Sequence, residues 1–162
     1  MTGLGDPGSV SALGGTLRQQ ALTLADLVVD LTDAAERGRR RSHPDLSARE
    51  RQLLERLARE LDVVGAALQS FTATVHAGSA RTRALADEAA RVDLVLDGNL
   101  VVEARGPSRV DPAERLQARE RLQELLNRVT AAEGKDLARV ARELARSGPA
   151  LARLSERARL GS

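Results

Sequence analysis

Residues 54–96 read LERLARELDVVGAALQSFTATVHAGSARTRALADEAARVDLVL, and this stretch decides the fold. Apolar or small side chains recur along it every seven residues, in two rows. One row contains Leu54, Leu61, Leu68, Val75, Thr82, Ala89 and Leu96, and the other contains Leu57, Val64, Phe71, Gly78, Leu85 and Val92. Two rows at this spacing predict one long amphipathic helix of the coiled-coil type. Because the rows keep their register through Gly78, they favour a continuous helix, bent at most at this glycine, over two helices with a tight break.

A shorter heptad helix precedes this stretch. It begins after Asp6 or Ser9, either of which can cap it, and it ends near Gly38. We expect the two helices to pair through a seam that contains Val10, Leu13, Leu17, Leu24, Leu27 and Leu31 of the first helix and Leu54, Leu57, Leu61, Val64, Leu68 and Phe71 of the second. Gly14 and Gly15 weaken the first turns but can let a neighbouring helix approach closely. Because the polar turn after Gly38 is short, the two helices are expected to form an antiparallel hairpin.

The longer helix begins close to Ala48 with a capping box, but its end has two interpretations. The heptad rows carry the helix to about Asp97, with Gly98 directly after its last turn, and we prefer this interpretation. The alternative is a β-hairpin, because Asp97-Gly98 separates two apolar runs, at 94–96 and 100–102.

The rest of the chain predicts further helices. Asp111 and Pro112 are typical of a helix start, while 133–135 and Gly148-Pro149 are expected to interrupt the helical pattern. The predicted class is therefore all-α, a long antiparallel helical hairpin with additional C-terminal helices in a bundle. Its segments are the helical hairpin at 1–97, a loop or short extended linker at 98–110, and C-terminal helices at 111–162 that pack on the hairpin or on a partner.

Part of the longer helix needs a second cover. The first helix is shorter and can cover only the first half of the longer one. The apolar residues Leu85, Val92 and Leu96 lie beyond its reach. Either the C-terminal helices fold back onto them or a second protein chain covers them, since an uncovered apolar surface favours association.

Enzymatic chemistry has little support in the sequence. Cys is absent, and His43 and His76 lie in different elements with no evident nucleophile or carboxylate partner. No zinc-protease, nucleophile-elbow or P-loop pattern occurs. The carboxylates recur at helical spacing from arginines, which is typical of solvated ion pairs. We therefore expect no enzyme, no cofactor and no metal site.

The charge pattern favours protein partners over nucleic acid. The chain has 25 basic and 23 acidic residues, so it creates no strong overall field. One basic cluster, Arg37, Arg39, Arg40 and Arg41, could bind a phosphate, an acidic partner or a lipid surface, although a helix end with a solvated loop is the favoured interpretation. No apolar run is long enough for a membrane span. With no Sec-type signal, we expect a cytoplasmic protein or export by a non-Sec route.

Several segments resemble one family. A Gly5-Asp6-Pro7 opening is followed by a heptad helix, a polar turn and a second long helix, and the segments at 101–103, 106–108 and 110–112 add further likeness. This order resembles the helical hairpins of the WXG-type (ESAT-like) substrates of type VII secretion, particularly their Trp-less actinomycete relatives, over roughly residues 5–145. The family's Trp-x-Gly turn is replaced here by residues 37–45, and its Tyr-containing export signal has no counterpart, because the chain has no Tyr.

The resemblance implies an assembly of two helical hairpins in a four-helix bundle. The partner would be a second copy or another helical protein that carries the export signal. We therefore expect a non-enzymatic helical interaction protein, a type VII-associated substrate or co-partner that forms a homodimer or a heterodimer. The alternatives are a cytosolic scaffold or chaperone, a basic adaptor that binds nucleic acid or anionic lipid through Arg37 to Arg41, and a closed monomeric bundle whose seams are only its core.

Overall fold

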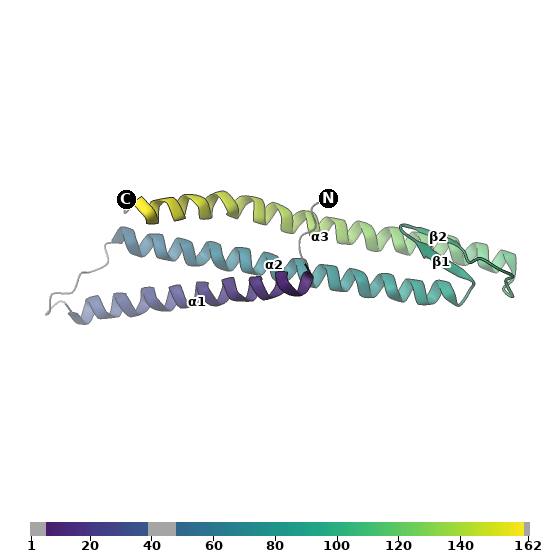
Figure 1. The fold of residues 1–162 in the computed structure, drawn as a ribbon, viewed down its shortest axis with the longest axis horizontal. Coiled ribbons are helices and arrows are strands. Elements are labelled where there is room, and N and C mark those ends of the chain that lie inside the picture. Colours follow the sequence, from purple (N-terminus) through teal and green to yellow (C-terminus); the bar gives the residue numbers. More distant parts are fainter. Residues whose placement is uncertain (1–5, 39–47, 161–162) are drawn as a thin grey trace. The chain divides into compact units, whose positions relative to one another are not determined.

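The computed structural model describes residues 6–38 and 48–160, and the side chains of 6–33 and 48–159. The fold is all-α with one β-hairpin, as the sequence predicts for its class (Figure 1). The elements in chain order are α1 (Pro7–Gly38), α2 (Ala48–Ala90), β1 (Leu94–Asp97), β2 (Leu100–Glu103) and α3 (Pro112–Leu160). They form two compact units, here named the terminal unit (residues 1–72 and 139–162) and the hairpin unit (residues 73–138).

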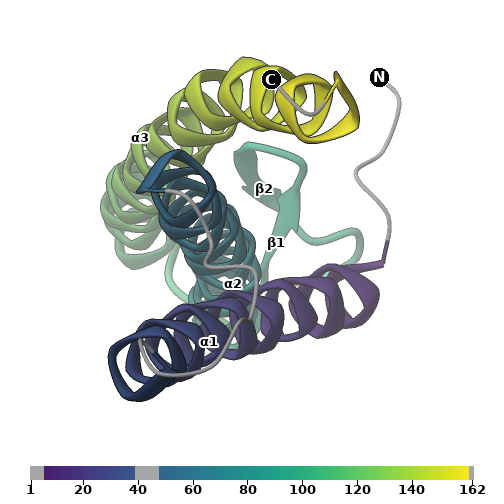
Figure 2. The same ribbon diagram turned by 90° about the vertical axis from the view of Figure 1, so that its left-hand side faces the viewer.

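In the terminal unit, α1 packs in the opposite direction along the first part of α2. Asp6 begins α1, because its Oδ2 accepts a hydrogen bond from the Ser9 amide at 3.1 Å. At the same end, the Thr72 hydroxyl donates to the Pro7 carbonyl oxygen at 3.3 Å. Further along, Arg18 Nε lies 2.9 Å from Asp62 Oδ1. Both views place the 48–72 segment of α2 between α1 and the 139–160 segment of α3 (Figures 1 and 2).

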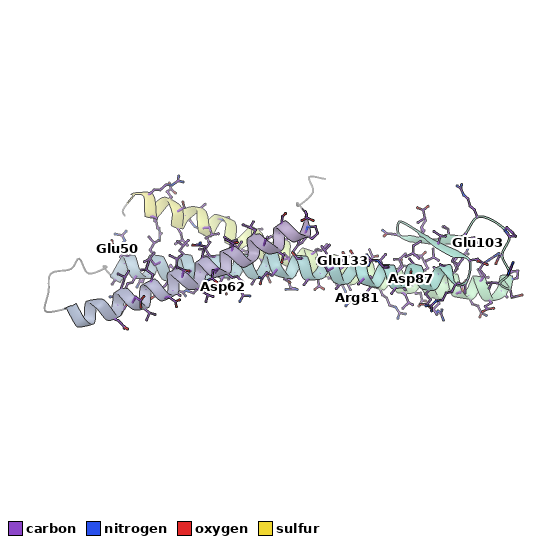
Figure 3. The ribbon with its side chains drawn as sticks, turned by 60° about the horizontal axis from the view of Figure 1, so that its bottom comes forward. Glu50, Asp62, Arg81, Asp87, Glu103 and Glu133 are labelled. Carbon is purple, nitrogen blue, oxygen red and sulfur yellow. The ribbon has the colours of Figure 1, made fainter. Side chains whose placement is uncertain are left out.

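The core of the hairpin unit contains large aliphatic side chains from every element of that unit. Its buried members are Leu85 and Ala89 of α2, Leu94 of β1, Val101 of β2, and Ala118, Leu122 and Leu126 of α3. A two-stranded hairpin is marginally stable by itself in water, so this packing against two helices is what supports it. Glu103, labelled at the β-hairpin in Figure 3, is the last residue of β2, and its carboxylate lies 3.3 Å from Arg115 of α3.

The preferred end of the longer helix, near Asp97, is wrong, and the alternative β-hairpin is what forms. Helix α2 ends at Ala90, and Asp93 then adopts a left-handed φ of 56° that no helix can continue. The strands pair from Leu94↔Glu103 to Asp97↔Leu100. Gly98 has a φ of 59° whereas Asn99 has a negative φ, which describes a type II′ turn with glycine at its first central position.

The outer side of β2 is bound by one side chain of α3. The Val101 amide donates to Gln123 Oε1 at 2.9 Å. Gln123 Nε2 in turn donates to the Asn99 carbonyl oxygen at 2.9 Å. The Gln123 amide therefore satisfies backbone groups that a third strand would otherwise bind. The segment 98–110, expected as a loop or short extended linker, thus contains β2 and only then a loop.

Helix α3 is longer than expected. The predicted interruptions at 133–135 and at Gly148-Pro149 are wrong, because one helix runs from Pro112 to Leu160 with Pro149 inside it. Added Cβ atoms at Gly134 and Gly148 would meet no atom within 4 Å, so these glycines carry no packing role within the chain. A single helical glycine costs only about 1 kcal/mol relative to alanine, which neighbouring buried contacts can offset. The expected continuity of α2 through Gly78 is confirmed.

Candidate helix-binding surface on α1

The contact between α1 and α2 uses a row of small residues. Gly14, Ala21 and Val28 are buried on α1, and Ala58, Gly65 and Thr72 are buried on α2. Both sets repeat every seven residues, as the heptad pattern predicts. On α1, however, the buried residues lie one position after Leu13 and Leu27 of the predicted seam, and one position corresponds to a rotation of about 100° around the helix.

The two helix backbones come closest at a pair of glycines. A Cβ atom added to Gly14 would lie 2.9 Å from the Gly65 carbonyl oxygen, and one added to Gly65 would lie 2.7 Å from the Gly14 carbonyl oxygen. Both distances are shorter than real Cβ contacts, so only glycine fits at either position. The sequence predicted a close helix approach at Gly14 but did not identify Gly65 as its partner. The position of Gly65, seven residues from both Ala58 and Thr72, is the pattern that could have identified it.

This rotation leaves large apolar side chains of α1 uncovered within the chain. Leu13, Leu27 and Leu31 are 53%, 44% and 37% exposed. These three residues, here named the α1 stripe, lie on one face because they are separated by multiples of about 3.6 residues. Their expected burial against α2 is therefore wrong, while their pairing with another chain stays a prediction.

The other seam residues lie closer to the terminal unit's interior. Val10, Leu17 and Leu24 of α1 are half-buried, between the row in contact with α2 and the α1 stripe. On α2, Leu68 is buried, and the remaining seam residues Leu54, Leu57, Leu61, Val64 and Phe71 are half-buried. The α2 half of the predicted seam therefore faces partly inward, in contrast to the exposed leucines of α1.

Charge is unevenly placed around α1. Arg18 binds Asp62 and also donates from Nη1 to Gln69 Oε1 at 3.1 Å, so it faces α2. Asp30 is exposed and borders the α1 stripe on the side away from α2, and the exposed Asp26 lies one turn before it, further around the helix toward Leu22. Any helix that covers the stripe would therefore meet a carboxylate along one border.

The predicted second-partner face is already covered. Leu85 belongs to the buried core of the hairpin unit, and Val92 and Leu96 pack against it. Of the two expected covers, the returning C-terminal helix together with the β-hairpin is the one observed. These three residues are therefore part of the core of the hairpin unit and not an open binding surface.

The remaining candidate residues form no recognisable site. Arg39, Arg40, Arg41 and His43 lie outside the described residues, as does the Arg37 side chain. His76 is exposed on α2. Among the side chains that the structure describes, no group of three or more histidine, aspartate or glutamate residues could hold a metal ion.

The described helices include none that is long and apolar enough to cross a membrane. Comparisons of the chain with protein-family models, with curated proteins and with solved structures found no match.

Proposed function

We propose that this protein is a non-enzymatic interaction protein that binds another helical chain through the α1 stripe. One observation carries the proposal: of the nine exposed large hydrophobic side chains among the described residues, three, Leu13, Leu27 and Leu31, share one face of α1. Single apolar residues on a surface are ordinary. Several that share one helix and one face are typical of helix-in-groove recognition.

Photocrosslinking in cells tests this proposal. A photoreactive amino acid at position 13 should form an adduct with a neighbouring protein when the full chain is expressed in its native host. Leu27→Glu should reduce the adduct by roughly tenfold or more, because a charge in the centre of a helix contact costs at least about 1.4 kcal/mol.

The matched control is Leu22→Glu. Leu22 is 59% exposed on the same helix but lies on the opposite face, so this substitution should leave the adduct unchanged. Circular dichroism should show both variants folded, because both positions are exposed. If no adduct forms, or if both substitutions reduce it equally, the α1 stripe is not the binding surface.

We further propose that the protein is associated with type VII secretion, as a substrate or as the co-partner of one. This proposal depends on the resemblance of residues 5–145 to the WXG-type helical hairpins. Because the chain has no Tyr, a different protein, bound to this chain or to its dimer, would have to supply the family's export signal.

The test is export in the native host, with and without the type VII secretion ATPase. The protein should reach the culture supernatant only when the ATPase is present, with a cytosolic protein as the control for lysis. Equal retention inside both strains would contradict the secretion proposal, would favour an intracellular scaffold, and would leave the crosslinking result standing.

A further inference from the structure

We propose that the α1 stripe binds the 139–160 segment of α3 from a second copy of this chain, in a reciprocal two-fold dimer. The inference depends on the proposed function of the α1 stripe as a binding surface, and it identifies the helix that binds there. It rests on three properties of the two segments: their charge, the open face of α3 and their common period.

The two segments carry opposite charge. Helix α1 has four acidic and two basic residues, a net charge of −2. The segment 139–160 has six arginines and two glutamates, a net charge of +4. A contact between α1 and α3 of a second copy therefore joins an acidic to a basic surface, whereas a contact between α1 and a second α1 would place like charges together.

The 139–160 segment has a face that the chain itself leaves open. Val140, Ser147 and Leu154 are buried, every seven residues, and face the interior of the terminal unit. A different face carries the exposed small residues Ala141, Ala145, Gly148 and Ala152. Side chains this small allow a neighbouring helix to approach closely, and a Cβ atom at Gly148 would meet nothing within 4 Å.

The two faces have matching periods. The small residues of α3 are spaced by four, three and four positions, the spacing of a heptad seam. Leu27 and Leu31, which are four positions apart, can therefore insert between them, whereas Leu13, 14 positions before Leu27, would lie against another part of the 139–160 segment. The exposed Arg142 and Arg153 lie beyond the small residues, on the side away from the buried row and past the exposed Glu156, as Asp30 and, further around, Asp26 lie beyond the α1 stripe.

A two-fold axis makes the contact twice. Because α1 and the 139–160 segment belong to the same terminal unit, α1 of each copy can bind α3 of the other. Such a reciprocal contact closes at two copies. It covers both open faces and leaves none to extend a chain of copies.

A charge-exchange experiment on the full chain tests the proposal. Sedimentation velocity should show a dimer for the wild type and monomers for two double variants, Asp26→Arg with Asp30→Arg, and Arg142→Glu with Arg153→Glu. Each variant alone places like charges in both contacts. A mixture of the two should restore a dimer that contains one copy of each variant, because each of its contacts then joins opposite charges.

The outcomes separate this inference from the proposed function. A wild-type monomer, or a dimer that ignores both double variants, overturns the second copy as occupant. A crosslink from position 13 to a different protein does the same, yet it leaves the α1 stripe as the binding surface. If the position 13 adduct persists in Leu27→Glu and in both charge variants, the second copy as occupant and the α1 stripe as binding surface are both overturned. Circular dichroism of each variant ensures that a monomer is a folded monomer.

Discussion

At Gly14, the lack of a side chain sets how closely α1 approaches α2. Its backbone meets the backbone of Gly65, and a backbone carbonyl oxygen cannot move aside as the end of a flexible side chain can. Gly15, the next residue, has open surroundings, because an added Cβ would lie 3.8 Å from Gln69 Nε2, an ordinary contact distance. Two adjacent glycines therefore have opposite roles.

Alanine substitutions should separate these roles. We expect Gly14→Ala to lower the free energy of unfolding by about 1–3 kcal/mol, because the helices must move apart. Gly15→Ala should raise it by about 0.5–1 kcal/mol, because alanine is the better helix former and meets no clash. Urea unfolding followed by circular dichroism measures both, and equal effects at the two positions would contradict the close approach.

At the scale of elements, Pro149 shows how packing overrides local preference. Proline lacks the amide that would donate to the carbonyl of Ala145, and its ring crowds that turn. Helix α3 nevertheless continues through it, with Ser147 and Leu154 buried on either side. The burial of those neighbours compensates for the lost hydrogen bond.

Pro149→Ala should therefore stabilise α3. Pro149 is exposed, so we expect a gain of up to about 3 kcal/mol in the free energy of unfolding. Gly134→Ala, in the same helix and with open space around it, is the reference, with a gain of about 1 kcal/mol. A loss of stability at position 149 would mean that proline fits a local bend that the packing requires.

The elements also show which features the sequence could specify. Caps at Asp6 and Asp111 and the rows through Gly78 predicted the helix starts and the continuity of α2 correctly. The end of α2 was missed because Val92 and Leu96 face inward in either a helix or a hairpin, so the seven-residue pattern could not distinguish them. The left-handed φ of Asp93 decides between the two, and Asp93 Oδ2 there accepts from the Ser108 hydroxyl at 2.7 Å. That bond joins residues 15 positions apart, beyond the reach of a local pattern.

The α1 stripe marks the limit of sequence reasoning at the candidate site. The heptad identified the apolar residues of α1 correctly but not which of them α2 would cover. That choice depends on the glycine pair, because the closest approach of the backbones fixes the rotation of α1. Neither helix specifies this rotation alone.

At the scale of the whole molecule, the two units differ in what they bury. The hairpin unit encloses Leu94 and Leu122, which are 1% and 0% exposed, whereas α1 buries Gly14, Ala21 and Val28. Burial of apolar area contributes roughly 25 cal/mol per Å², so small residues contribute less. The α1 contact should therefore be the weaker part of the fold.

Hydrogen exchange should show this difference. We expect amides of α1 to exchange through local opening faster than those of residues 82–90 and 118–126, which surround the core of the hairpin unit. Mass spectrometry of peptides from the full chain, at several protein concentrations, gives the measurement. Slower exchange in α1 at every concentration would contradict the ranking.

The contact of Gln123 with β2 also has a consequence for solubility. A short strand with an open side is a template on which extended segments of other molecules can add, and this is one route to fibrils. The side-chain amide of Gln123 occupies that position on β2 with the geometry of a peptide group. One glutamine thereby protects the outer side of β2, in an otherwise helical protein, from pairing with a strand of another molecule.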